Sequence, residues 1–167
     1  AMELVRMHHA DGIILCAIEN DWDKIRSYEQ YGKVVVCNEY NEDTSISTVC
    51  GRQYEGFYKA AEYLIGKDYQ RIAYCTGSRG VMHQPKGMNL DSDRYSGYIE
   101  ALAAHGMTAD PNLIFTKKKT MDDGRRILQE ILKIENRPDA IIAGSDEVAA
   151  GILTEAMKHG INIPEDL

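Results

Sequence analysis

The sequence predicts an α/β fold built on parallel strands, and two observations support this class. Short apolar runs are continuous rather than alternating, as expected for strands that are covered on both faces. The segments between these runs have helical periodicity, so strands alternate with helices as in βαβ units. The five apolar runs are GIILCAI (12–18), KVVVCN (33–38), RIAYCT (71–76), NLIFT (112–116) and AIIAG (140–144).

Three of the intervening segments carry apolar side chains along one helical face. The three faces consist of Ala60, Ala61, Leu64 and Ile65; of Tyr95, Ile99 and Leu102; and of Gly124, Ile127, Leu128, Ile131 and Leu132. Thr120 and Asp123 have the spacing of a capping box, which predicts the start of a helix. Gly106 and Gly160 follow the last turns of two helices, where glycine commonly ends a helix.

The composition is that of a soluble globular protein, with 167 residues, 44% hydrophobic residues and a net charge of −7. This acidity argues against these residues gripping a nucleic-acid backbone, which requires a basic surface. No apolar run approaches the roughly 18 residues of a membrane helix, and the first residues have no apolar signal-peptide segment. We therefore expect a cytoplasmic protein that does not interact with membranes.

The four cysteines predict reduced thiols rather than a metal site. Cys16, Cys37 and Cys75 fall inside or at the end of apolar runs, and Cys50 has no close partner. Structural zinc sites use tightly spaced ligand pairs, which this pattern lacks. We expect Cys16, Cys37 and Cys75 to be core thiols of a cytosolic protein.

Two polar stretches interrupt the alternation of strands and helices. Residues 39–53 are too long for a simple turn, and residues 77–93 carry three glycines and a proline after a strand. In open α/β sheets, the loops beyond the carboxyl ends of strands form the ligand crevice. Both stretches are therefore candidate binding loops.

Ser145 and Asp146 join the last apolar run to the next helix and allow two interpretations. Ser145 suits a helix N-cap, and Asp146 and Glu147 place negative charge in the first turn, where the helix dipole favours it. The same joint lies at a strand's carboxyl end, where open sheets bind ligands. Capping explains every residue of the joint, and the sequence pattern alone favours it.

Arg94 is the second candidate for ligand binding. We expect it in the first turn of a helix that begins within DSDRYSGYIEAL (91–102), where a positive charge opposes the helix dipole. Neighbouring Asp91 and Asp93 could compensate for this charge, and so could the hydroxyl groups or carboxylate of a ligand. The residues leave these alternatives open.

No motif supports catalysis, a cofactor or a metal. His8 and His9 are adjacent, which is the wrong spacing for a shared metal ion on a helix, and the other histidines are isolated. The chain has no nucleophile elbow, no nucleotide-binding P-loop and no GxGxxG motif after a strand. We therefore expect a protein that is not an enzyme.

Several segments, taken in order, resemble the effector-binding domain of the LacI/GalR family of bacterial transcription regulators. They are ADGIIL (10–15), VVVCNEY (34–40), YEGFYKAAEYLIGKDYQRIAYCTG (54–77), DRYSGYIEALAAHG (93–106) and RPDAIIAGSDEVAAGILTEAMKHGINIPEDL (137–167). The last block is the most specific, because its strand, polar-Asp joint, Ala-x-Gly helix and G-[ILV]-x-[IV]-P-x-D tail occur together in the family. The resemblance spans essentially the whole chain.

The resemblance implies a periplasmic-binding-protein-like fold whose two lobes contain parallel sheets flanked by helices. Residues 1–50 would form part of the first lobe and residues 51–167 an incomplete second lobe, with the chain changing lobe near residues 48–53. The helical pattern that starts at Met2 and the tail INIPEDL (161–167) lead us to expect a fragment that is incomplete at both ends.

The resemblance also implies function. A sugar or related metabolite would bind as effector between the lobes, and operator DNA would be bound only through a headpiece preceding this chain. Arg94 falls on the family's ligand-binding arginine, and Ser145 and Asp146 on its polar-Asp pair. Ala17 and Asn38, at the ends of the first two strands, would form the facing wall. A homodimer would form through helices of the first lobe.

Two departures from the family pattern accompany the resemblance. Gly51 and Arg52 replace the usual Asp before the crossover helix, which puts the geometry of the lobe crossing in doubt. Asp68 replaces a usual Gly, although Asp tolerates the left-handed conformation expected there. An alternative function is a stand-alone or exported sugar-binding protein of the same fold, and the residues upstream of this chain would distinguish the two.

Overall fold

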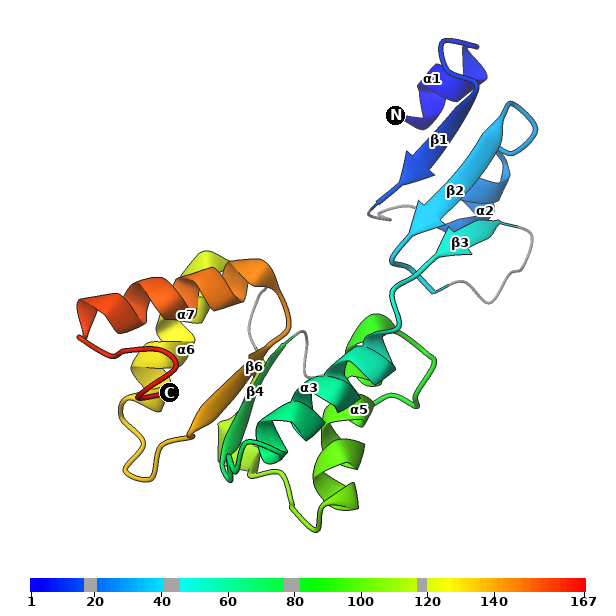
Figure 1. Ribbon diagram of the computed structural model, residues 1–167. Coiled ribbons are helices and arrows are strands. Elements are labelled where there is room, and N and C mark those ends of the chain that lie inside the picture. Colours follow the sequence, from blue (N-terminus) through cyan, green and yellow to red (C-terminus); the bar gives the residue numbers. More distant parts are fainter. Residues whose placement is uncertain (17–20, 41–45, 77–81, 117–119) are drawn as a thin grey trace. The chain divides into compact units, whose positions relative to one another are not determined.

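The computed structural model describes residues 1–16, 21–40, 46–76, 82–116 and 120–167. These residues form two compact units, unit 1 (Ala1–Arg52) and unit 2 (Gln53–Leu167). Each unit contains a three-stranded parallel sheet with flanking helices, and Figure 1 labels these elements. The predicted parallel α/β class is therefore confirmed.

Unit 1 is organised around the central strand of its sheet, β2. Its elements are α1 (Met2–Arg6), β1 (Gly12–Leu15), α2 (Trp22–Arg26), β2 (Lys33–Cys37) and β3 (Ser47–Val49). The strand order is β1-β2-β3, and both pairings are parallel. Val34 and Val36 lie on the same face of β2 and form a small core with Ile25 and Ile46.

The sheet of unit 2 has the strand order β5-β4-β6. Its elements are α3 (Gln53–Ile65), β4 (Ile72–Thr76), α5 (Leu90–Ala104), the short 3-10 helix η1 (Pro111–Leu113), β5 (Ile114–Thr116), α6 (Met121–Ile131), β6 (Ala140–Ala143) and α7 (Asp146–Lys158). Helices α3 and α5 cover one face of the sheet, and α6 and α7 cover the other (Figure 1).

The central strand β4 is buried on both faces, which explains why its apolar run is continuous. Ile72 and Tyr74 pack into the core formed with α3 and α5. Ala73 and Cys75 pack into the core formed with α6 and α7. Successive strand residues point to opposite faces, so a strand between two helical layers needs an apolar residue at every position.

Helices α6 and α7 touch through glycine. A Cβ atom on Gly151 would lie 2.0 Å from the backbone oxygen of Met121, and one on Gly124 would lie 2.2 Å from that of Val148. These distances are far shorter than real contacts allow, so the backbones approach as closely as they do only because both residues lack a side chain. The glycine of the Ala-x-Gly pattern therefore serves helix packing.

The predicted helix ends are confirmed at four places. Thr120 and Asp123 form the capping box of α6, and Gly106 and Gly160 adopt positive φ after α5 and α7. Asp68, which replaces the glycine usual in the family, has a φ of 66°. The left-handed conformation expected at this position is therefore present without glycine.

Three details differ from the prediction. Strand β3 was not expected, because its three side chains are all exposed and show no apolar pattern. Helix α2 is only five residues long, too short to show a helical period. Cys75 is buried and Cys37 half-buried, but the prediction that Cys16 is a core thiol is wrong, because Cys16 lies exposed just after β1.

We expect Gly151→Ala to lower the free energy of unfolding by about 1–3 kcal/mol, the usual cost of inserting a methyl group into a filled contact. The added atom would meet backbone rather than a flexible side chain, so the helices would have to move apart. Urea unfolding followed by circular dichroism measures the effect. Gly56→Ala in α3 is the control: its Cβ would meet nothing within 4 Å, and helix propensity should raise stability by up to about 1 kcal/mol.

The stability of the α6–α7 pair should also depend on acid pH through Glu155. The Glu155 carboxylate accepts hydrogen bonds from Gln129 Nε2 at 2.6 Å and from Lys158 Nζ at 2.9 Å. These hydrogen bonds, that of Gln129 above all, lower the pKa of Glu155 to about 2 from its ordinary value of 4.5. A carboxyl group with a lowered pKa stabilises the fold above the unfolded pKa, and this contribution disappears as the pH falls toward the folded pKa.

We therefore expect Glu155→Gln to lower the melting temperature at neutral pH and to reduce its decline between pH 4.5 and 2. Thermal unfolding followed by circular dichroism across this pH range measures both effects. Glu62→Gln, on the exposed side of α3, is the matched control and should leave the melting curve nearly unchanged. An equal acid response in Glu155→Gln and the unmodified chain would contradict the assignment.

Candidate functional site

The carboxyl ends of β4 and β6 lie next to each other in the sheet of unit 2. The two strands pair in parallel, with Cys75 opposite Ala143. Just beyond them, the Gly144 N–H donates a hydrogen bond of 2.6 Å to the Cys75 carbonyl oxygen. The first residues of α7 therefore leave the sheet directly at this edge, which is the position where open α/β sheets bind ligands.

Ser145 is the N-cap of α7, as predicted. Its hydroxyl oxygen accepts a hydrogen bond from the Val148 N–H at 3.4 Å. Asp146 is the first residue of the helix, is exposed, and makes no hydrogen bond or ion pair with the described residues. The cap is thus made by the serine, and the Asp146 carboxylate is left as an acceptor at the sheet edge.

The prediction that Arg94 lies in the first turn of its helix is wrong. Helix α5 begins at Leu90, where Asn89 and Ser92 form a capping box, so Arg94 is the fifth residue of the helix. Asn89 is a stronger start signal than the acidic residues that follow it, because its side chain accepts the Ser92 N–H. The helix dipole therefore contributes less at Arg94 than expected.

Arg94 is instead held by its neighbours in unit 2. Its Nε donates a hydrogen bond of 2.7 Å to Gln53 Oε1 at the start of α3. Its Nη1 lies 3.6 Å from Asp91 Oδ1, and the guanidinium carbon lies 5.7 Å from the centre of the Phe57 ring. The side chain is only 15% exposed, and its contacts with Asp91 and Gln53 show that Arg94 joins α5 to α3.

These contacts restrain the guanidinium group without using all its donors. The contacts involve Nε and Nη1, and Nη2 makes no hydrogen bond to the part of unit 2 that the structure describes. Sequence reasoning missed Gln53, which orients the group through its amide oxygen. No sequence signal could have identified it, because the pairing depends on how α3 packs against α5.

Arg94 and Asp146 make no direct contact among the described residues. The two residues have equivalent places in the topology, because α5 follows β4, α7 follows β6, and these two strands are parallel neighbours. A guanidinium donor and a carboxylate acceptor are together suited to the hydroxyl groups of a polar ligand.

Two residues of unit 1, Asn38 and Ala17, were predicted to contact the ligand, and the structure describes only Asn38. Asn38 follows the carboxyl end of β2, is exposed, and has a φ of 56°. Its N–H donates to the Val49 carbonyl at 2.9 Å, and its Oδ1 accepts a 3.4 Å hydrogen bond from the Gly51 N–H. Ala17 lies outside the described residues.

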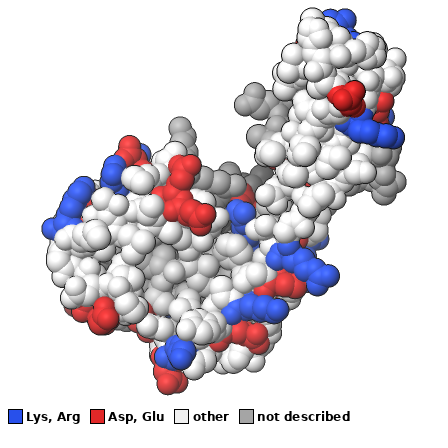
Figure 2. All heavy atoms as spheres, turned by 45° about the horizontal axis from the view of Figure 1, so that its top comes forward, with Lys and Arg blue, Asp and Glu red and all other residues white. Residues whose placement is uncertain are grey.

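Three other features would each indicate a different function: a metal site, a membrane-spanning helix and a basic surface. Within the described ranges, no group of three or more His, Cys, Asp or Glu side chains is arranged to hold a metal ion, and no described helix is long and apolar enough to cross a membrane. Basic and acidic side chains are interspersed over the visible face of unit 2 rather than gathered into a basic surface (Figure 2).

Comparison with known proteins agrees with this geometry. The family model described as "Periplasmic binding proteins and sugar binding domain of LacI family" matches residues 1–167. The NTD biosynthesis operon regulator NtdR of Bacillus subtilis is 34% identical over 166 residues, which cover 99% of this chain and 48% of NtdR. The chain therefore spans about half the length of this curated relative.

Solved structures show the same fold. A regulatory protein of the LacI family from Chloroflexus aggregans is 27% identical, with a TM-score of 0.76 over 99% of this chain and 57% of that protein. A LacI family regulator from Lactobacillus casei, solved with bound sucrose, has a TM-score of 0.78 over 99% of this chain and 59% of that protein. At 22% identity, this second likeness concerns the fold alone.

The predicted periplasmic-binding-protein-like fold is thus confirmed, as is the resemblance stated from the sequence. Because the family model matches the entire sequence, the chain belongs to the family of periplasmic binding proteins and sugar-binding domains of LacI-type transcriptional regulators.

Proposed function

We propose that this chain is the ligand-sensing part of a LacI/GalR-type transcriptional regulator and that it binds a small sugar-like effector between its two units. Arg94, Ser145 and Asp146 would contact the effector from unit 2, and Asn38 and Ala17 would do so from unit 1. The observation that carries this proposal is the exposed Asp146 carboxylate, which lies at the carboxyl edge of the sheet and is not used by the cap of α7.

The physical case for a sugar rests on complementary polar groups. Asp146 offers acceptors to sugar hydroxyl groups, and Arg94 offers donors whose orientation Gln53 restrains. Preoriented groups lose less conformational entropy on binding than free side chains do. The family description names a sugar-binding domain, which supports the same ligand class.

The remaining parts of the proposal concern the whole protein. Operator DNA would be bound through a headpiece outside this chain, and the protein would act in the cytoplasm without catalysing a reaction. The second candidate is a stand-alone or exported sugar-binding protein of the same fold, since the family description includes periplasmic binding proteins. A helix-turn-helix upstream of this chain would favour the first function, and a cleavable signal would favour the second.

We expect Asp146→Asn to weaken sugar binding by about 1.5–3 kcal/mol, the contribution of a hydrogen bond to a charged group. A thermal-shift panel of neutral and phosphorylated sugars that includes sucrose would first select the ligand, and calorimetry would then measure its affinity. Stability should change little, because the Asp146 side chain is exposed and makes no hydrogen bond or ion pair with the described residues. Glu147→Gln, exposed in the same helical turn, is the control and should keep full affinity.

Arg94→Ala should weaken binding of the same sugar by a similar amount, but it should also reduce stability because the side chain joins α5 to α3. Gln53→Ala removes the hydrogen bond that orients Arg94 but keeps its guanidinium group, so it should weaken binding less than Arg94→Ala does. If Arg94→Ala and Gln53→Ala reduce affinity equally, Arg94 acts only through packing. Unchanged affinity in both Arg94→Ala and Asp146→Asn would overturn the proposed site.

We also propose that the protein is a homodimer joined through helices of unit 1. Leu4 on α1 and Met7 at its end are 51% and 52% exposed, although both are large apolar side chains. Exposed apolar side chains on the same short helix can form part of a patch that a partner covers. Light scattering should show a dimer that Leu4→Glu shifts toward monomer, whereas Leu153→Glu in unit 2 should not. A monomer at high protein concentration would contradict this part of the proposal.

A further inference from the structure

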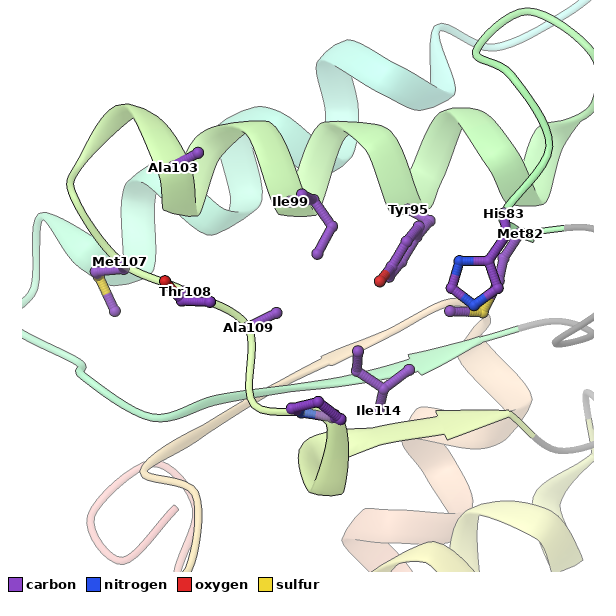
Figure 3. A pocket seen from close by; sticks show the side chains of 10 residues that line it. Met82, His83, Tyr95, Ile99, Ala103, Met107, Thr108, Ala109 and Ile114 are labelled. Atoms are coloured by element: carbon purple, nitrogen blue, oxygen red, sulfur yellow. The ribbon is translucent and has the colours of Figure 1, made fainter.

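Unit 2 contains a cavity of about 400 Å³ that is separate from the polar edge described above. It lies between α5 and the edge strand β5, and Figure 3 shows Tyr95 and Ile99 of α5 directed toward Ile114 of β5. Arg94 and Asp146 are not among its lining residues. Its volume falls within the range of about 300–1,000 Å³ that is typical of small-molecule pockets.

The lining of this cavity is apolar and uncharged. None of the ten lining residues is Asp, Glu, Lys or Arg, and the polar side chains are Tyr95, Thr108 and His83. No charged side chain in the lining could pair with an ionic ligand, so a charge held against these apolar side chains would have no ionic partner in the lining. The cavity therefore favours an uncharged occupant that is mainly hydrocarbon.

Tyr95 supplies a fixed hydrogen-bonding group. Its ring packs edge-on against Tyr74 at 5.6 Å and against His83 at 5.1 Å, and its hydroxyl group points into the cavity (Figure 3). The hydroxyl makes no hydrogen bond to the described residues. Burial raises the pKa of Tyr95 above its usual value, so the group stays protonated at neutral pH and can donate to an acceptor on the occupant.

Two methionines lie toward opposite ends of the cavity. Met82 is almost fully buried beside His83, and Met107 lies where the chain leaves α5 (Figure 3). Thioether groups adapt to irregular shapes and make favourable contacts with aromatic rings. These properties favour a planar aromatic occupant over a bulky aliphatic one.

We propose that this cavity is a second ligand site, which binds a small, uncharged aromatic molecule whose hydrogen-bond acceptor meets the Tyr95 hydroxyl. The site does not depend on sugar binding at the polar edge. A regulator with both sites would respond to two chemically different inputs.

Acetophenone is a suitable probe, because it combines an aromatic ring with one carbonyl acceptor. Its titration into protein labelled at the methionine methyl groups should shift the signals of Met82 and Met107 saturably. The other five of the seven methionines lie outside the lining and should not respond. Equal shifts of all methyl signals, or shifts that do not saturate, would show non-specific association and overturn the proposal.

Three variants locate the site. Tyr95→Phe keeps the ring but removes the donor, so acetophenone should bind roughly three- to tenfold more weakly, as expected for one neutral hydrogen bond, and ethylbenzene, which has no acceptor, should be unaffected. Ala103→Trp adds bulk at the cavity and should abolish binding, whereas Ala104→Trp, one residue away and outside the lining, should not. Acetophenone affinity that survives both Tyr95→Phe and Ala103→Trp would place the binding elsewhere and contradict the proposal.

Discussion

The structure of unit 2 depends on the burial of its central strand, β4, between two layers of helices. Parallel pairing with β5 and β6 on its two edges satisfies its backbone, and alternate side chains enter the two cores. Because Tyr74 fills one core and Cys75 the other, a charged or strongly polar side chain in the middle of the strand would lose packing. Polar residues can appear only where the strand ends, so the same constraint that builds the core also restricts ligand-binding groups to the carboxyl edge.

Close helix packing adds a second restriction on the sequence. It explains why three helix positions are occupied by glycine, which ligand binding would not explain. Gly124 and Gly151 let α6 and α7 approach until their backbones touch, and Gly97 does the same for α5 beside the Tyr54 carbonyl of α3. These contacts fix where each helix begins relative to the sheet. The contact between α3 and α5 places Gln53 within reach of Arg94. The orientation of the guanidinium group therefore depends on the packing of Gly97, farther along α5, against α3.

The elements that the sequence predicted are those that local chemistry determines. The apolar runs, the Thr120–Asp123 capping box and the glycines after α5 and α7 each depend on a few neighbouring residues, and all are confirmed. The features that the sequence did not predict depend on residues that are far apart in the chain. Strand β3 has only exposed side chains and forms because β2 offers an open edge, and the Gln53–Arg94 hydrogen bond joins residues 41 positions apart. The start of α5 is a local feature that the sequence prediction placed too late, because Asn89 and not the following acidic residues is the N-cap.

Ser145 and Asp146 are adjacent residues at the start of α7, and one can serve the helix cap while the other remains a candidate ligand contact. An N-cap needs one side-chain acceptor, and Ser145 provides it to the Val148 N–H. The helix dipole still favours the charge of Asp146 there, although the carboxylate makes no hydrogen bond or ion pair with the described residues of unit 2. The first turn of α7 can therefore hold an exposed acceptor ready for a hydroxyl ligand at little expense to the fold. Arg94 is in the opposite situation, because the dipole disfavours a cation near the N-terminus of a helix, although less in the second turn than in the first. Contacts with Gln53, Asp91 and Phe57 hold this cation.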